Sequence, residues 1–140
     1  MLIGSREFVE IKLLREEGKS STYTGYYTIY GYFVEYHVKT DLCEFRGNDY
    51  FEEDHLREFY KNVFDIFNNR SGLAALNRSI DFGFDLLVDA RPHNEIIFNV
   101  KQRYLYLKNN REERIQNIEV NFSCEKSESV FESLADIRIE

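Results

Sequence analysis

Acidic side chains are the most abundant polar groups in this sequence, and paired carboxylates are the residues that carry out acid/base and glycosidase chemistry. Asp81, Asp85 and Asp89 recur at every fourth position of one predicted strand. Because a strand rises about 3.3 Å per residue, such carboxylates stand about 13 Å apart, beyond the roughly 5–10 Å that glycosidases use. We therefore predict a structural role for these acids, with Lys101 and Arg103 of the next strand opposite them in cross-strand ion pairs.

A second acidic group lies in the segment GNDYFEEDH, residues 47–55, and consists of Asp49, Glu52, Glu53 and Asp54. Negative charge is favoured at the start of a helix, and Asp can cap one, so a following helix explains part of this group. Tyr50 lies among these acids, and aromatic anchors flanked by charges suit a protein interface. The sequence predicts that these five residues bind a basic protein partner, and the alternative is a solvated loop.

Six of the ten tyrosines fall in TYTGYYTIYGYFVEYH, residues 22–37. Sites for single-stranded nucleic acid interleave aromatic residues with Lys and Arg. No Lys or Arg occurs from residue 22 to residue 38, and Glu35 adds a negative charge. The stretch is therefore interpreted as strand residues, or as a strand face that meets another protein. Tyr27 and Glu35 on that face join the predicted partner-binding residues.

Other side chains with chemical potential are dispersed. His37, His55 and His93 lie on separate predicted elements without metal-ligand spacing, and no nucleophile, phosphate-loop or dinucleotide motif occurs. Cys43 and Cys124 lie inside apolar strand patterns, which favours reduced core thiols in a cytoplasmic protein over a disulfide. The sequence predicts no catalytic residues, no metal and no cofactor.

Composition limits the classes of partner. The chain has 140 residues, is 43% hydrophobic and contains one proline, which predicts a single domain over residues 1–140. The net charge of −7, from 18 basic and 25 acidic residues, argues against nucleic acid and anionic lipid as direct partners and suits a basic protein. The N-terminal residues lack the features of a signal peptide, and no apolar run is long enough to span a bilayer.

The elements that position these residues follow from apolar periodicity. Leu56, Phe59, Val63 and Phe67 belong to a stripe that predicts a helix over about 54–69. Period-two alternation predicts strands over 7–14, 34–38, 42–46, 82–89, 95–107 and 115–125, with a short helix at 127–137. Loops or turns are expected at 15–21, near residue 31, at 47–49 and at 108–113. The predicted fold is α+β: an antiparallel meander sheet with the main amphipathic helix packed on one face and a short C-terminal helix.

The order of these segments resembles the WapI-type immunity proteins of bacteria. The resemblance covers residues 30–140 and rests on LREFYKNVFDIF, SGLAAL, FDLLVDA, IIFNVK, IEVNFSC and SESVFESLADI in that order. The family would imply a non-catalytic protein that binds one cognate toxin domain of a polymorphic or contact-dependent system, commonly a nuclease, and blocks it. The family has no shared catalytic residues to carry over. The turn Pro92-His93-Asn94 and the segment after Cys124 depart from the expected pattern.

Two further functions are compatible with the sequence. An acidic secretion chaperone that holds an unfolded effector segment would have a similar length and charge, but such chaperones begin with a helix and dimerise. A small-ligand-binding α+β domain would need a deep pocket with convergent polar groups, lined here by Tyr and Phe.

Overall fold

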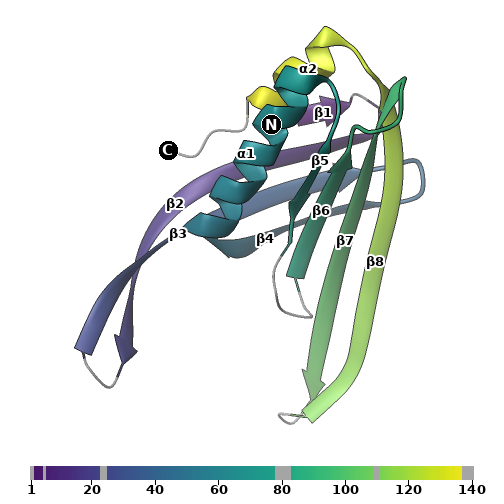
Figure 1. Cartoon of the computed structure of the whole chain (residues 1–140). Helices are drawn as coiled ribbons and strands as arrows, with labels where there is room; N and C mark the ends of the chain where they lie inside the picture. The colour runs from purple at the N-terminus through teal and green to yellow at the C-terminus, as the bar shows by residue number, and fades with distance from the viewer. Residues whose placement is uncertain (1, 5, 23–24, 78–82, 109–110, 137–140) are drawn as a thin grey trace.

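The computed structural model describes residues 2–4, 6–22, 25–77, 83–108 and 111–136; within the strands, the side chains of 13–22, 25–31, 33, 104–108 and 111–116 are not described. Four strands and a helix are followed by four more strands and a second helix (Figure 1). The elements are β1 (Leu2–Gly4), β2 (Phe8–Thr22), β3 (Gly25–Lys39), β4 (Glu44–Glu52), α1 (Glu53–Asn69), β5 (Leu73–Leu76), β6 (Gly83–Asp89), β7 (Glu95–Lys108), β8 (Arg111–Glu125) and α2 (Glu128–Ala135).

The strands form two antiparallel meanders, in the orders β1-β2-β3-β4 and β5-β6-β7-β8. The predicted α+β class, the main helix and the short C-terminal helix are confirmed. The strands divide into two sheets because β4 leads directly into α1, and the chain then starts a new ladder at β5.

Three predicted turns are wrong, because the chain continues as strand through each of them. Residues 15–21 lie in β2, and Gly31 lies in β3 opposite Glu16. Gly47–Asp49 lies in β4, opposite Val34–Tyr36 of β3. Cross-strand hydrogen bonding over these long ladders outweighs the local turn preference of single glycines. The segment predicted as a loop over 108–113 also enters β8 at Arg111.

Alternation along β2, β3 and β4 gives the first sheet one buried face and one wet face. The buried side chains are Val9, Ile11, Tyr32, Val34, Tyr36, Val38, Phe45 and Phe51. The second sheet contributes Phe84, Leu86, Val88, Ile96, Phe98, Val100, Val120 and Phe122. Both sets belong to one hydrophobic cluster, so the two sheets and the helices share a single core.

Helix α1 has one buried face, as its periodicity predicts. Leu56, Phe59, Val63 and Ile66 are buried, and the helix packs against β3, β4 and β5. Burying each such side chain contributes about 1.5–3 kcal/mol, so this face accounts for much of the attachment of the helix. The expected Asp54 cap is wrong: Glu52 is the N-cap, and its side chain makes no capping hydrogen bond.

Arg70 ends α1 and joins it to α2. Its backbone is left-handed, with φ of 58°, and its N–H donates to Ile66 O. Its guanidinium lies over the Phe131 ring at 4.4 Å and donates to Glu128 Oε2 at 2.9 Å. The Ser127 hydroxyl caps α2 by accepting from Val130 N.

Two contacts connect the sheets at their centre. The Tyr36 ring of β3 stacks on the Phe84 ring of β6, with centroids 4.0 Å apart. The Asp49 carboxylate of β4 accepts a hydrogen bond from Phe84 N at 2.9 Å. Phe84 is therefore held by the first sheet through both its ring and its backbone.

Two hairpins extend beyond their sheets (Figure 1). β2 and β3 remain paired as far as Thr22 and Gly25, whereas β4 pairs with β3 only from Gly31 to Lys39. Residues 25–30 of the tyrosine-rich segment therefore lie on a two-stranded ribbon of β2 and β3. The side chains of these residues are outside the described part of the structure.

Candidate functional site

The wet face of the first sheet carries most of the candidate residues that the structure describes. Strand register sets Glu10, His37 and Arg46 side by side across β2, β3 and β4. The neighbouring row contains Lys12, Glu35 and Asn48. Because side chains two apart on a strand share a face, these charged groups form a compact patch on one surface.

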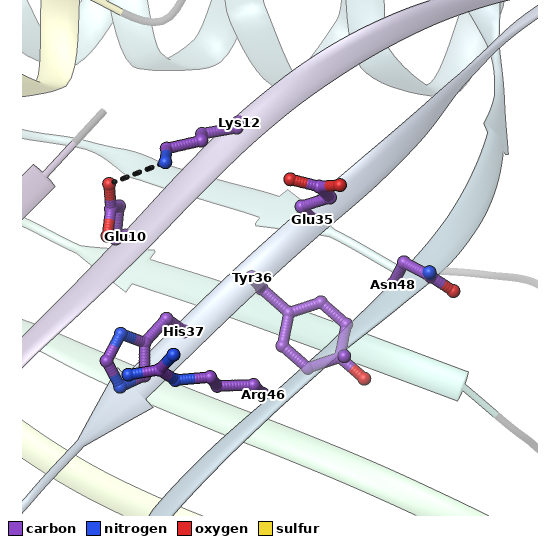
Figure 2. A pocket seen from close by; sticks show the side chains of 8 residues that line it. Glu10, Lys12, Glu35, Tyr36, His37, Arg46 and Asn48 are labelled. Carbon is purple, nitrogen blue, oxygen red and sulfur yellow. Dashed lines mark ion pairs between the residues drawn. The ribbon is translucent and has the colours of Figure 1, made fainter.

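This patch is hollowed. The hollow has a volume of about 390 Å³, and Figure 2 shows side chains from all three strands around it. Its lining includes Glu10, Lys12, Glu35, His37, Arg46 and Asn48. Gly47 of β4 also lines it, opposite Tyr36. The volume lies within the range of ligand pockets, but the walls are charged, whereas ligand pockets are mostly apolar.

Most charges around the hollow are already paired. Glu10 Oε1 lies 3.5 Å from Lys12 Nζ, and Glu44 Oε1 lies 3.6 Å from an Arg46 guanidinium nitrogen. A 2.7 Å hydrogen bond joins His37 Nε2 to Glu44 Oε1, and this bond lowers the pKa of the Glu44 carboxyl. The Phe8 and His37 rings pack in a T-shaped arrangement, with centroids 4.8 Å apart. The side chain of His37 is thus fixed from two sides.

Three of the predicted acids remain available. Glu35, Glu52 and Asp54 are exposed, and none of them has an ion pair or hydrogen-bonded side chain within the described residues. Glu35 lies opposite Asn48 of β4, which is four residues before Glu52 in the same strand. The rows that contain Glu35 and Glu52 are therefore about 13 Å apart along the strand direction. Asp54 follows in the first turn of α1. We call Glu35, Glu52 and Asp54 the acidic strip.

The remaining predicted residues have other surroundings. Asp49 points toward the second sheet, where its carboxylate accepts from Tyr50 N and Phe84 N. Tyr50 is half-buried, and its alternation in β4 places it on the same face as Glu52. Glu53 accepts hydrogen bonds from the Arg57 guanidinium one turn along α1. Tyr27 lies in β3, and its side chain is outside the described residues.

Of the other acidic group, the structure describes Asp85 and Asp89, which lie four positions apart on β6. Asp85 lies opposite Lys101 in the ladder, as predicted, whereas Asp89 pairs with Arg91 of the following turn at 2.9 Å. Lys101 also reaches Glu119 of β8, at 3.8 Å. Asp81 lies outside the described residues.

Cys43 and Cys124 are free and half-buried against the core, and burial raises the pKa of the Cys124 thiol. Within the described ranges, no group of three His, Cys, Asp or Glu side chains is arranged to hold a metal ion. No helix in those ranges is long and apolar enough to cross a membrane.

Sequence reasoning missed part of this surface. The alternation of Glu10, Lys12, His37 and Arg46 with apolar neighbours was visible, but only the register between strands brings the four together. The exposure of Phe64 on α1 was also missed: its ring stacks with the half-buried rings of Tyr60 and Phe67. Comparisons of the chain with protein-family models, with curated proteins and with solved structures gave no match.

Proposed function

We propose that this chain is a non-catalytic immunity protein that binds and neutralises a cognate bacterial toxin domain in the cytoplasm. The observation that carries the proposal is the acidic strip, whose three carboxylates are exposed and unpaired within the described residues. Unpaired surface charges of one sign form few internal contacts and are available to steer and select a charged partner.

The dimensions of the strip favour a protein partner over a small ligand. Glu35 on β3 and Glu52 on β4 stand in rows about 13 Å apart along the strand direction, and Asp54 lies in the first turn of α1, a spread that several Lys or Arg side chains of a basic domain can match. Tyr50 lies on the same face as Glu52 and supplies a large amphipathic side chain beside the charges. A basic toxin domain, such as a nuclease that must attract phosphate, has the complementary charge.

The hollow beside the strip supports an alternative, a small-ligand-binding α+β domain. Its mixed charges would suit a polar ligand, although its open, charged walls differ from the apolar lining typical of tight ligand sites. The hollow and the strip share Glu35, so a single set of variants addresses both functions.

The direct test is binding to the polypeptide encoded immediately upstream of this chain's gene. The purified toxin domain is titrated with this protein by calorimetry, and toxicity is scored in cells that express the domain with or without the protein. We expect a folded 1:1 complex whose association rate falls as salt is raised, together with protection from toxicity.

Charge reversal then locates the surface. Glu35→Lys combined with Glu52→Lys is expected to weaken binding about tenfold or more, because like charges then face each other across the interface. Glu95→Lys combined with Glu132→Lys makes the same change in net charge at exposed positions on β7 and α2, and should leave the affinity nearly unchanged. Absence of binding to the encoded domain, or binding only to an unfolded segment of it as for a secretion chaperone, would overturn the proposal.

A further inference from the structure

The outer edge of β8 is the longest uncovered strand edge in the described structure. β8 is the last strand of its sheet, spans 15 residues, and pairs only with β7. In Figure 1 no helix or strand runs parallel to β8 on its outer side, and the connected ends of β3 and β4 cross behind it. The other terminal strands are short or engaged: β1 has 3 residues, β5 lies against α1, and β4 contacts β6. Because β1 pairs only with Phe8–Glu10, the outer side of β2 beyond Glu10 has no ladder partner among the described strands, but this stretch is shorter than β8.

Residues 117–125 of this edge carry few of the features that normally prevent pairing. Native edges are protected by proline, by charged side chains, by bulges or by very short strands. The sequence NIEVNFSCE contains no Pro, Gly, Lys or Arg, and its only charged side chains are Glu119 and Glu125. The irregularity in the β7–β8 ladder lies farther along, at Tyr106 and Leu107.

The inner face of β8 is also incompletely covered. Ile96, Phe98 and Val100 of β7 are fully buried, whereas Ile118 and Cys124 of β8 are only half-buried. Between these two, Phe122 stacks on Phe98 with centroids 4.9 Å apart. One more strand beside β8 would extend the buried layer over Ile118 and Cys124.

We propose that this strand is β8 of a second copy of the chain, paired antiparallel about a two-fold axis at Asn121, so that the two four-stranded sheets join into one. In this register Glu119 faces Ser123 of the second copy, and Asn117 faces Glu125 of the second copy. On the inner face, Val120 meets Phe122 of the second copy and Ile118 meets its Cys124. Polar side chains then face polar ones, apolar side chains face apolar ones, and no like charges are opposed.

Neighbouring registers that preserve the faces fit less well. An axis at Glu119 sets two glutamates opposite each other, and an axis at Phe122 sets Glu119 opposite Glu125. An axis at Val120 sets Glu125 opposite Ile115. Like charges directly opposite are destabilising, which disfavours the axes at Glu119 and Phe122. The axis at Val120 opposes no like charges, but it leaves the Glu125 carboxylate opposite an apolar residue, so Asn121 is the preferred centre. Such isologous pairing closes on itself and uses the β8 edges of both copies.

Ser123 provides the test, because it is exposed and has no hydrogen-bond partner in the described structure. Sedimentation equilibrium of the full chain should show a reversible monomer–dimer equilibrium. Ser123→Glu places a like charge opposite Glu119 at two symmetric positions, which raises the dimer Kd about two- to thirtyfold at low salt. Ser123→Lys places an opposite charge there and lowers the dimer Kd by a comparable factor.

Ser71→Glu and Ser71→Lys are the matched controls, since Ser71 is exposed in the connection before β5 and should leave dimerisation unchanged. Urea unfolding verifies that all variants fold. As an independent readout, alkylation of Cys124 should slow as protein concentration rises, while alkylation of Cys43 should not. A wild-type chain that remains monomeric up to about 1 mM, or a dimer indifferent to the charge at position 123, would overturn the proposal.

Discussion

The Asp49 carboxylate is the polar link between the two sheets, and its removal tests this account of the core. In Asp49→Ala the N–H of fully buried Phe84 loses its acceptor, which stands at 2.9 Å. A hydrogen bond to a charged group contributes about 1.5–3 kcal/mol, and a buried donor left without a partner costs about 1–3 kcal/mol. Both values describe the loss of the same hydrogen bond and are not added together. We therefore expect the free energy of unfolding to fall by about 2–3 kcal/mol.

Urea unfolding followed by circular dichroism measures this change. The midpoint should fall while the m-value stays constant, because the same surface is exposed on unfolding. Asn48→Ala is the control: Asn48 is exposed on the opposite face of β4, and its truncation should change stability by less than about 0.5 kcal/mol. An Asp49→Ala protein within about 0.5 kcal/mol of wild type would refute the assignment of Asp49 as the link between the sheets.

Two further predictions concern stability. Gly47→Ala should lower the free energy of unfolding by about 1–3 kcal/mol in the same assay. The added Cβ would lie 2.7 Å from Cζ of Tyr36, and the Tyr36 ring is fixed by its stack on Phe84. An unchanged urea midpoint would show that the ring can move. Hydrogen bonds from Arg91 lower the pKa of the Asp89 carboxyl below its ordinary 3.8. Ionised Asp89 therefore stabilises the fold above pH 3.8, and this stabilisation is lost as the pH falls through the lowered pKa of the folded protein. The stability difference between wild type and Asp89→Asn should therefore shrink below about pH 4 in a pH series of urea unfolding, and a difference independent of pH would contradict this linkage.

The main helix was predictable to within one residue at its start, because Leu56, Phe59 and Val63 form a stripe that only a helix can bury on one side. The strands were harder to bound. Gly18, Gly31 and Gly47 each suggested a turn, but ladder pairing holds all three in strands. β5 was missed as a strand because four residues, LAAL, carry too little periodicity to identify one.

The candidate site was predictable only where side-chain direction follows from alternation. Glu35 is exposed as expected, since it lies between inward-facing Val34 and Tyr36, and Glu52 is exposed because it follows inward-facing Phe51 in β4. The role of Asp49 was not predictable, because its partner Phe84 is 35 residues away in sequence and in another sheet. The hollow depends on the register of three strands, which a single sequence does not specify.

The nearest-neighbour order of both meanders has a consequence for how the chain folds during synthesis. Every ladder joins strands that follow each other in sequence, so the first sheet and α1 are complete once residue 69 has been made. Pairings between adjacent segments form quickly because little chain entropy is lost in closing them. The second sheet covers the apolar side of that first half only when its last strand, which ends at Glu125, has been made. The interval between residues 69 and 125 is therefore the part of translation in which the nascent chain is most exposed to aggregation.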